Sequence, residues 1–152
     1  MADLNAQVTA GEASITSTAK TVILLQAPSN QRLRIKGIEV FGKGTSNTDT
    51  PVKVELLKAA SISGGTAGSV TASALDPDYA ETLQATASGN YSAEPTYTTA
   101  VVVRTWEVHP QTGLVVYFPM HDEIKVKGGG VFAVRLTSNQ AETVSVNLVY
   151  EE

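Results

Sequence analysis

The sequence has no cysteine, so no disulfide framework or thiolate metal site can hold the fold, and no thiol nucleophile is available. It has only two histidines, His109 and His121, and neither belongs to a histidine-carboxylate motif with the spacing of a metal or catalytic site. No Gly-x-Ser-x-Gly sequence occurs, and residues 42–45 lack the first glycine of a phosphate-binding loop. We therefore expect no catalytic residue, no cofactor and no metal, and we do not expect an enzyme.

Positive charge and long apolar runs are also scarce. The chain has 11 Lys and Arg residues against 15 Asp and Glu residues, and its formal net charge is -4. Nucleic-acid recognition needs a concentrated basic surface, so DNA and RNA are not expected partners. No run approaches the ~20 apolar residues of a membrane span, and residues 1–20 lack the charged start and apolar core of a signal peptide. We expect no membrane partner and synthesis in the cytoplasm.

What the sequence does contain is short runs in which apolar and polar residues alternate, separated by Gly, Pro, Ser, Asn and Asp. The last run is the clearest, because Val144, Val146 and Leu148 alternate with polar residues. No long helical pattern is present. About eight such runs predict an all-β, two-sheet β-sandwich that is jelly-roll-like. They cover residues 21–26, 31–41, 52–57, 100–108, 114–118, 123–127, 131–137 and 143–150.

The chain of 152 residues suits one domain, which we place at residues 19–152. Residues 1–18 are polar and have little apolar surface, so we expect an extended or disordered N-terminal arm. Within the run 31–41 the apolar phase shifts by one residue at Gly37, which predicts a β-bulge there. The proline at Pro77, between two aspartates, permits one or two helical turns.

The segment from Ser61 to Thr99 is rich in Ser, Thr, Ala and Gly and is too long for an ordinary connection. It is either a contact surface or a loop that lies over the sandwich. Its tyrosines, Tyr79, Tyr91 and Tyr97, are candidate protein-binding residues.

A basic stripe on one predicted strand face gives three further candidates, Arg32, Arg34 and Lys36. They either meet an acidic partner surface or form a solvated face. The lone Trp106 packs in the core or anchors an interface. His121 precedes two acidic residues, but neighbouring strand residues point to opposite faces, so we interpret this segment as a polar turn.

The order of several short motifs resembles that of small capsid-associated proteins of tailed bacteriophages. These motifs are residues 51–57, 80–84, 93–95, 106–113, 117–119, 123–124, the triple glycine 128–130 and the terminal strand that ends at 150–152. The resemblance implies a decoration or cement protein, a β-sandwich that is expected to be a homotrimer on the outside of the head. The implied partners are the major capsid protein and further copies of the chain, and the implied location is the virion surface.

A second hypothesis is a carbohydrate-binding or host-adhesion jelly-roll module on a virion. Tyr91, Tyr97 and Trp106 would then stack on sugar rings, and Asp76 and Asp78 would supply polar or calcium contacts. No sequence motif brings these residues together.

Overall fold

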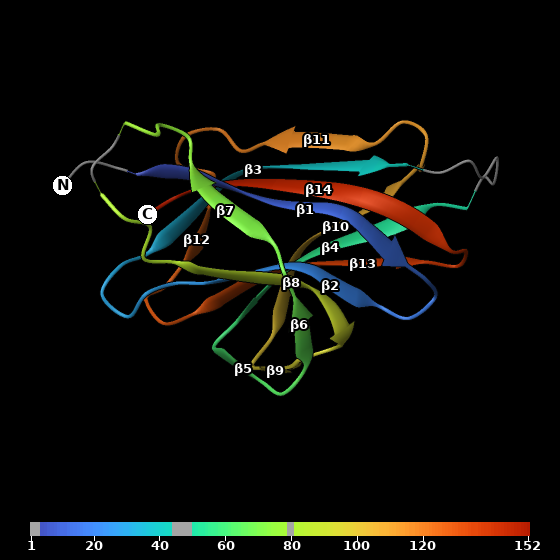
Figure 1. Ribbon diagram of the computed structural model, residues 1–152, viewed down its shortest axis with the longest axis horizontal. Helices are drawn as coiled ribbons and strands as arrows, with labels where there is room; N and C mark the ends of the chain where they lie inside the picture. Colours follow the sequence, from blue (N-terminus) through green and yellow to red (C-terminus); the bar gives the residue numbers. More distant parts are fainter. Residues whose placement is uncertain (1–3, 44–49, 79–80) are drawn as a thin grey trace.

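Two antiparallel six-stranded sheets pack face to face in the computed structural model, which describes residues 4–43, 50–78 and 81–152 (Figure 1). Sheet A has the order β11-β3-β14-β1-β7, with β12 pairing with β3 beside β11. Its strands are β1 (Asn5–Ile15), β3 (Leu33–Gly42), β7 (Thr71–Ala74), β11 (Leu114–Tyr117), β12 (Ile124–Val126) and β14 (Glu142–Glu151).

Sheet B has the order β10-β4-β13-β2-β8-β6. Its strands are β2 (Lys20–Gln26), β4 (Val52–Ala59), β6 (Thr66–Gly68), β8 (Thr86–Ala93), β10 (Val101–Val108) and β13 (Val131–Ser138). A separate two-stranded sheet, β5 (Ser61–Ser63) with β9 (Thr96–Thr98), lies at the bottom of the view in Figure 1. The predicted all-β sandwich is therefore confirmed.

The strand pairing outside residues 61–99 is that of a jelly roll. If β11 and β12 are taken as one interrupted strand, the first strand pairs with the last, the last with the third, and the third with the sixth. In the other sheet the second strand pairs with the seventh, the seventh with the fourth, and the fourth with the fifth. Two interlocked Greek keys give this order. The eight predicted runs correspond to β2, β3, β4, β10, β11, β12, β13 and β14, and β1 is the jelly-roll strand that they lack.

The bulge predicted at Gly37 is present. In the β3–β14 ladder Val149 pairs with Gly37 but Tyr150 pairs with Ile35, so the register shifts across Lys36. Leu33 and Ile35 before the shift and Ile38 and Val40 after it are all buried. The extra residue lets one strand keep its apolar side chains on the core face despite the change of phase.

The expected N-terminal arm is instead a central strand of sheet A. β1 pairs with β14 on one side and with β7 on the other. The segment is extended, but Ala6, Val8, Ala10 and Ile15 are buried in the main core. Small alanines at every second position gave it a weak apolar signal, although they fit the space between two sheets. Residues 1–3 lie outside the described part of the chain.

The segment from Ser61 to Thr99 joins β4 to β10, as expected for a long connection, but it contains five strands of its own. β7 extends sheet A, β6 and β8 extend sheet B, and the two-stranded β5–β9 sheet covers the outer face of sheet B. A second, smaller core forms under the β5–β9 sheet from Leu24, Leu57, Ala59, Tyr91, Val131 and Ala133, with Ile62 and Tyr97 against it. This explains why the apolar runs of β2 and β13 are nearly continuous: both faces of these strands are covered.

The short helix considered after Asp76 is absent from the described residues, where positions 76–78 form a turn. Nor do the described residues include a helix long and apolar enough to span a membrane.

Candidate protein-binding site

Two of the three basic residues predicted to meet a partner are bound within the chain. Arg34 Nη1 lies 2.8 Å from Glu151 Oε1. Lys36 Nζ lies 2.8 Å from Glu123 Oε1 and 2.5 Å from Glu151 Oε2. Because these charges are already neutralised by carboxylates of sheet A and its β11–β12 connection, Arg34 and Lys36 tie β3 to β14 and to the segment before β12. They are poor candidates for an acidic partner.

The pKa shifts in this cluster follow from the same contacts. The hydrogen bond from Lys36 lowers the pKa of Glu123 below its usual value, and the bonds to Glu123 and Glu151 raise the pKa of Lys36. These contacts favour the ionised forms of both Lys36 and Glu123, so the group is a structural ion cluster. The third residue, Arg32, lies just before β3, is exposed, and lines a pocket at the end of the sandwich.

The tyrosines of the long connection pack against the body of the protein where the structure describes them. Tyr91 is buried in the small core under the β5–β9 sheet, and Tyr97 of β9 is half-buried and packs against that core. The Tyr97 hydroxyl donates to Thr21 Oγ1 at 2.5 Å, and Thr21 Oγ1 donates to Glu94 Oε2 at 2.7 Å. Burial raises the pKa of Tyr97 to about 12. These contacts fasten the connection to β2, so the two tyrosines stabilise the packing of the chain. Tyr79 lies outside the described residues.

The sugar-stacking arrangement is not formed. Trp106 is on β10 at one edge of sheet B, whereas Tyr91 is on β8, separated from it by β4, β13 and β2. Trp106 is half-buried and packs against the main core, which is the first of the two alternatives. Asp76 Oδ1 accepts a hydrogen bond from the Asp78 N–H at 3.1 Å, which is a local turn.

The segment around His121 is the predicted polar turn. The Asp122 N–H donates to the Pro119 carbonyl at 2.9 Å, and His121 has a positive φ of 80°. Glu123 points instead to Lys36. Within the described ranges, no three His, Asp or Glu side chains gather in a way that would hold a metal ion.

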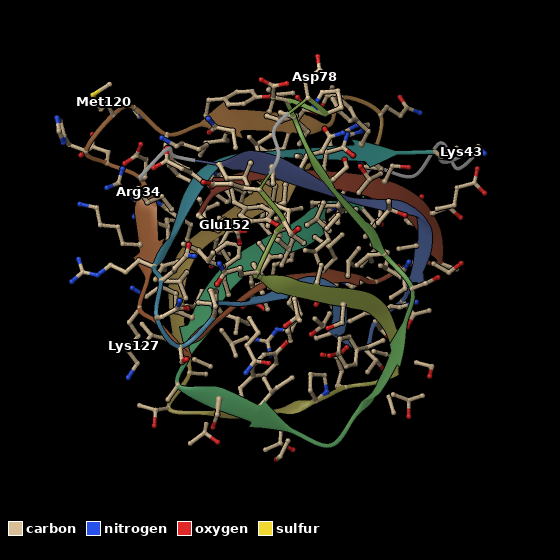
Figure 2. All side chains as sticks on the ribbon, turned by 60° about the vertical axis from the view of Figure 1, so that its left-hand side comes forward. Arg34, Lys43, Asp78, Met120, Lys127 and Glu152 are labelled. Carbon is tan, nitrogen blue, oxygen red and sulfur yellow. The ribbon has the colours of Figure 1, made fainter. Side chains whose placement is uncertain are left out.

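The most distinctive surface is the side of the sandwich between β10 and the β11–β12 edge, which we call the open side. Seven large hydrophobic residues are exposed in the described chain, and six of them lie on β3, β10, β11 or the loop that follows β11. They are Phe41, Val101, Val102, Val115, Tyr117 and Met120. Met120 has 77% of its surface exposed and points away from the loop after β11 (Figure 2). Apolar side chains gathered on one side mark a contact surface more than scattered ones do.

The main core is also incompletely covered on the open side. Side chains of β10, β11 and β12 that pack against the core remain partly exposed there; they are Val103, Trp106, Leu114, Val116, Phe118 and Ile124. In the described structure β10 pairs only with β4, and β11 pairs only with β3. Both strands therefore present unpaired backbone N–H and C=O groups next to apolar side chains, which is the form of a strand edge that takes up a partner.

Two exposed aromatic rings, those of Tyr117 and Phe41, lie directly against glycines, which leave room for them. A Cβ atom at Gly37 would lie 2.5 Å from Tyr117 Cδ1, and one at Gly113 would lie 2.6 Å from Phe41 Cδ1. The Tyr117 hydroxyl also donates to Glu39 Oε1 at 2.8 Å. Rings fixed in this way lose little conformational entropy when a partner covers them, so they suit an interface.

Sequence reasoning did not find the open side. The run of Val101, Val102 and Val103 is part of the strand predicted over residues 100–108, and no local signal shows that this strand is an edge. That fact depends on which strands pair, and those partners are distant in the sequence. Comparison of the chain with protein-family models, with curated proteins and with solved structures found no significant match.

Proposed function

We propose that this chain is a structural virion protein that binds the outside of a bacteriophage head and stabilises the capsid by bridging neighbouring capsomers. The phage assignment rests on the sequence resemblance to small capsid-associated proteins. The proposed partners are the major capsid protein and further copies of the chain, which we expect to form a trimer. The virion surface is the proposed location, and no enzymatic step is part of the proposal.

The observation that supports an assembly role is the open side. A rigid sandwich in which two edge strands, β10 and β11, each leave one edge unpaired near six exposed apolar residues offers that side to a partner. Two sheets with a shared core keep this surface in one shape, so little conformational entropy is lost on binding. A symmetric oligomer would present several such surfaces at once, and weak contacts would then act together.

Capsid stabilisation would follow from linkage. A ligand that binds the intact lattice and not the separated capsomers stabilises the lattice by RT ln(1 + [L]/Kd), about 3 to 4 kcal/mol per site when the ligand is in hundred- to thousandfold excess over Kd. Since a head has many sites, the effect on its rupture would be large. Affinity through an apolar interface would depend little on salt.

The test is co-sedimentation with heads of the phage that encodes the chain, prepared without this protein. The double variant Val102→Lys with Val115→Lys places a charge on each edge strand of the open side. Thr71→Lys is the matched control, because Thr71 is an exposed residue of β7, an edge strand on the other side of sheet A. We expect wild type and the control to bind and the double variant to bind at least tenfold more weakly, on the order of 1.4 kcal/mol.

Saturated heads should also rupture at a higher temperature than bare heads. Absence of binding by wild type, or equal rupture temperatures at demonstrated saturation, would overturn the cement role. Unchanged binding by the double variant would remove the open side as the contact surface. Circular dichroism of each variant separates loss of binding from loss of folding.

A further inference from the structure

A pocket of about 410 Å³ lies at one end of the sandwich, where the end of β4, the loop before β3, the start of β10 and the β12–β13 turn meet. Its rim carries four basic residues from three separate segments: Arg32, Lys58, Lys125 and Lys127. No acidic side chain lines it. Figure 2 shows Lys127 projecting at the lower left of the molecule, away from the ribbon.

This concentration of charge is unusual in a chain with a net charge of -4. Among the described residues, five of the 11 Lys and Arg side chains form ion pairs with carboxylates of the chain. Four of the other six surround this pocket. Lys58 Nζ donates to the Lys125 carbonyl at 2.9 Å, which holds the β4 and β12 sides of the rim together. The pocket is therefore a local positive site on an acidic protein.

The floor of the pocket decides the class of ligand. It is formed by the buried aliphatic side chains Ala59, Val126 and Val131, with the exposed Val101 beside them. An inorganic anion would leave these side chains uncovered. A peptide that carries an aliphatic side chain followed by carboxylates would fill the floor and meet the cations at the rim.

The chain itself presents such a peptide directly after β7. Leu75 has 49% of its surface exposed, and Asp76 and Asp78 beside it are exposed as well. The Leu75 N–H donates to the Asn5 carbonyl at 2.9 Å, and Asp76 Oδ1 accepts from the Asp78 N–H, so the turn is anchored and preorganised. In the described chain no cation lies within ion-pair distance of either aspartate.

A second exposed hydrophobic residue, Met120, also precedes acidic residues. Glu123 in that segment is already held by Lys36 at 2.8 Å, however. The turn at residues 75–78 is therefore the better complement to the pocket. In Figure 2 Asp78 is at the top of the molecule and Lys127 at the lower left, so the turn does not occupy the pocket of its own chain.

We propose that the basic pocket binds the Leu75–Asp78 turn of a second copy of this chain. Each copy then offers one pocket and one turn at different places, which is a head-to-tail contact. Such a contact closes into a ring when the rotation between copies permits. This inference rests on the self-association in the proposed function and names its two surfaces, but it does not depend on the capsid.

The test is a charge swap in the full chain, read by light scattering and sedimentation equilibrium. Reversing the pocket (Lys125→Glu with Lys127→Glu) or the turn (Asp76→Lys with Asp78→Lys) should weaken self-association at least tenfold. Combining all four substitutions in one chain should restore it, because each reversed pocket then meets a reversed turn. The control Lys20→Glu with Lys43→Glu makes the same change of net charge outside the pocket and should associate like wild type.

A monomeric wild type at 100 µM, an unaffected pocket variant, or failure of the fourfold variant to recover while it remains folded would each overturn the inference. If the turn variant associates like wild type while the pocket variant does not, the occupant is another segment, such as the one around Met120, and the proposal is wrong. Head co-sedimentation of the same variants separates the two proposals. Binding to heads by a non-associating variant would retain the capsid role, and a swap that behaves as expected without head binding would retain the inference alone.

Discussion

Tyr150 offers a direct test of how polar groups in the core affect stability. Its side chain is fully buried between the sheets, and its hydroxyl has no hydrogen-bond partner among the described residues. A buried tyrosine hydroxyl usually has a partner, because leaving it unpaired loses its hydrogen bonds to water. Burial also raises the pKa of Tyr150, as expected for a phenol that is far from solvent. Tyr150→Phe removes this hydroxyl and keeps the ring.

The expected gain follows from two opposing effects. An unpaired buried hydroxyl destabilises the folded state by about 1–3 kcal/mol. Its removal leaves a void of roughly 10 Å³, which costs about 0.2 kcal/mol at ~24 cal/mol per Å³. Tyr150→Phe should therefore raise the free energy of unfolding by about 1 kcal/mol or more. For a chain of this size that corresponds to a Tm increase of about 2–4 °C.

Tyr97→Phe is the matched control, because the same atom is removed from a hydroxyl that donates to Thr21 Oγ1 at 2.5 Å. It should lower the free energy of unfolding by about 1 kcal/mol. Urea titrations with unchanged m values and calorimetric melts measure both variants. A loss of stability in Tyr150→Phe comparable to that in Tyr97→Phe would show that the Tyr150 hydroxyl is hydrogen-bonded, and it would refute the reasoning.

Three further predictions concern pH and packing. Burial raises the pKa of Tyr97 from 10.0 to about 12. The stability that this hydroxyl contributes is therefore present below pH 10 and lost as the pH rises through 12. In urea titrations Tyr97→Phe should lose less stability over that range than wild type. The hydrogen bond from Lys36 lowers the pKa of Glu123 from 4.5, so this contribution is present above pH 4.5 and lost as the pH falls through the lower folded value. Lys36→Met should reduce the acid-side slope of stability, and an identical slope would contradict the role of this pair. A Cβ at Gly89 would lie 2.1 Å from the Val22 carbonyl oxygen, whereas one at Gly11 would meet nothing within 4 Å. Gly89→Ala should therefore cost about 1–3 kcal/mol in thermal melts and Gly11→Ala little, and equal effects would count against the close approach of β2 and β8.

Much of the fold could be predicted from local patterns. Period-two alternation located the main strands other than β1, and the phase change at Gly37 predicted the bulge that the β3–β14 ladder contains. These features were accessible because the side-chain direction of a strand residue depends on its immediate neighbours. The prediction was wrong for β1, since its alanines carry little apolar signal and their burial depends on the opposite sheet.

The candidate site was far less accessible. Arg34 and Lys36 carried a local signal of exposed positive charge, but Glu151, which pairs with both, is more than 100 residues away in the sequence. Tyr91 and Tyr97 suggested a contact surface, but Tyr91 is buried in the small core between sheet B and the β5–β9 sheet, and Tyr97 packs against that core. For these four residues the sequence shows only the residue type. What surrounds each side chain depends on strand partners that no local pattern reveals.

The sequence by itself therefore determined the strand content, the absence of thiol chemistry and the acidic net charge, because these depend on residue identity and on nearest neighbours along the chain. The tertiary structure decided which strands lie at an edge, which charges are neutralised and which cations gather around one pocket. Strand pairing brings residues together regardless of their separation in the sequence. An unpaired edge or an unneutralised charge is defined by what lies beside it in space.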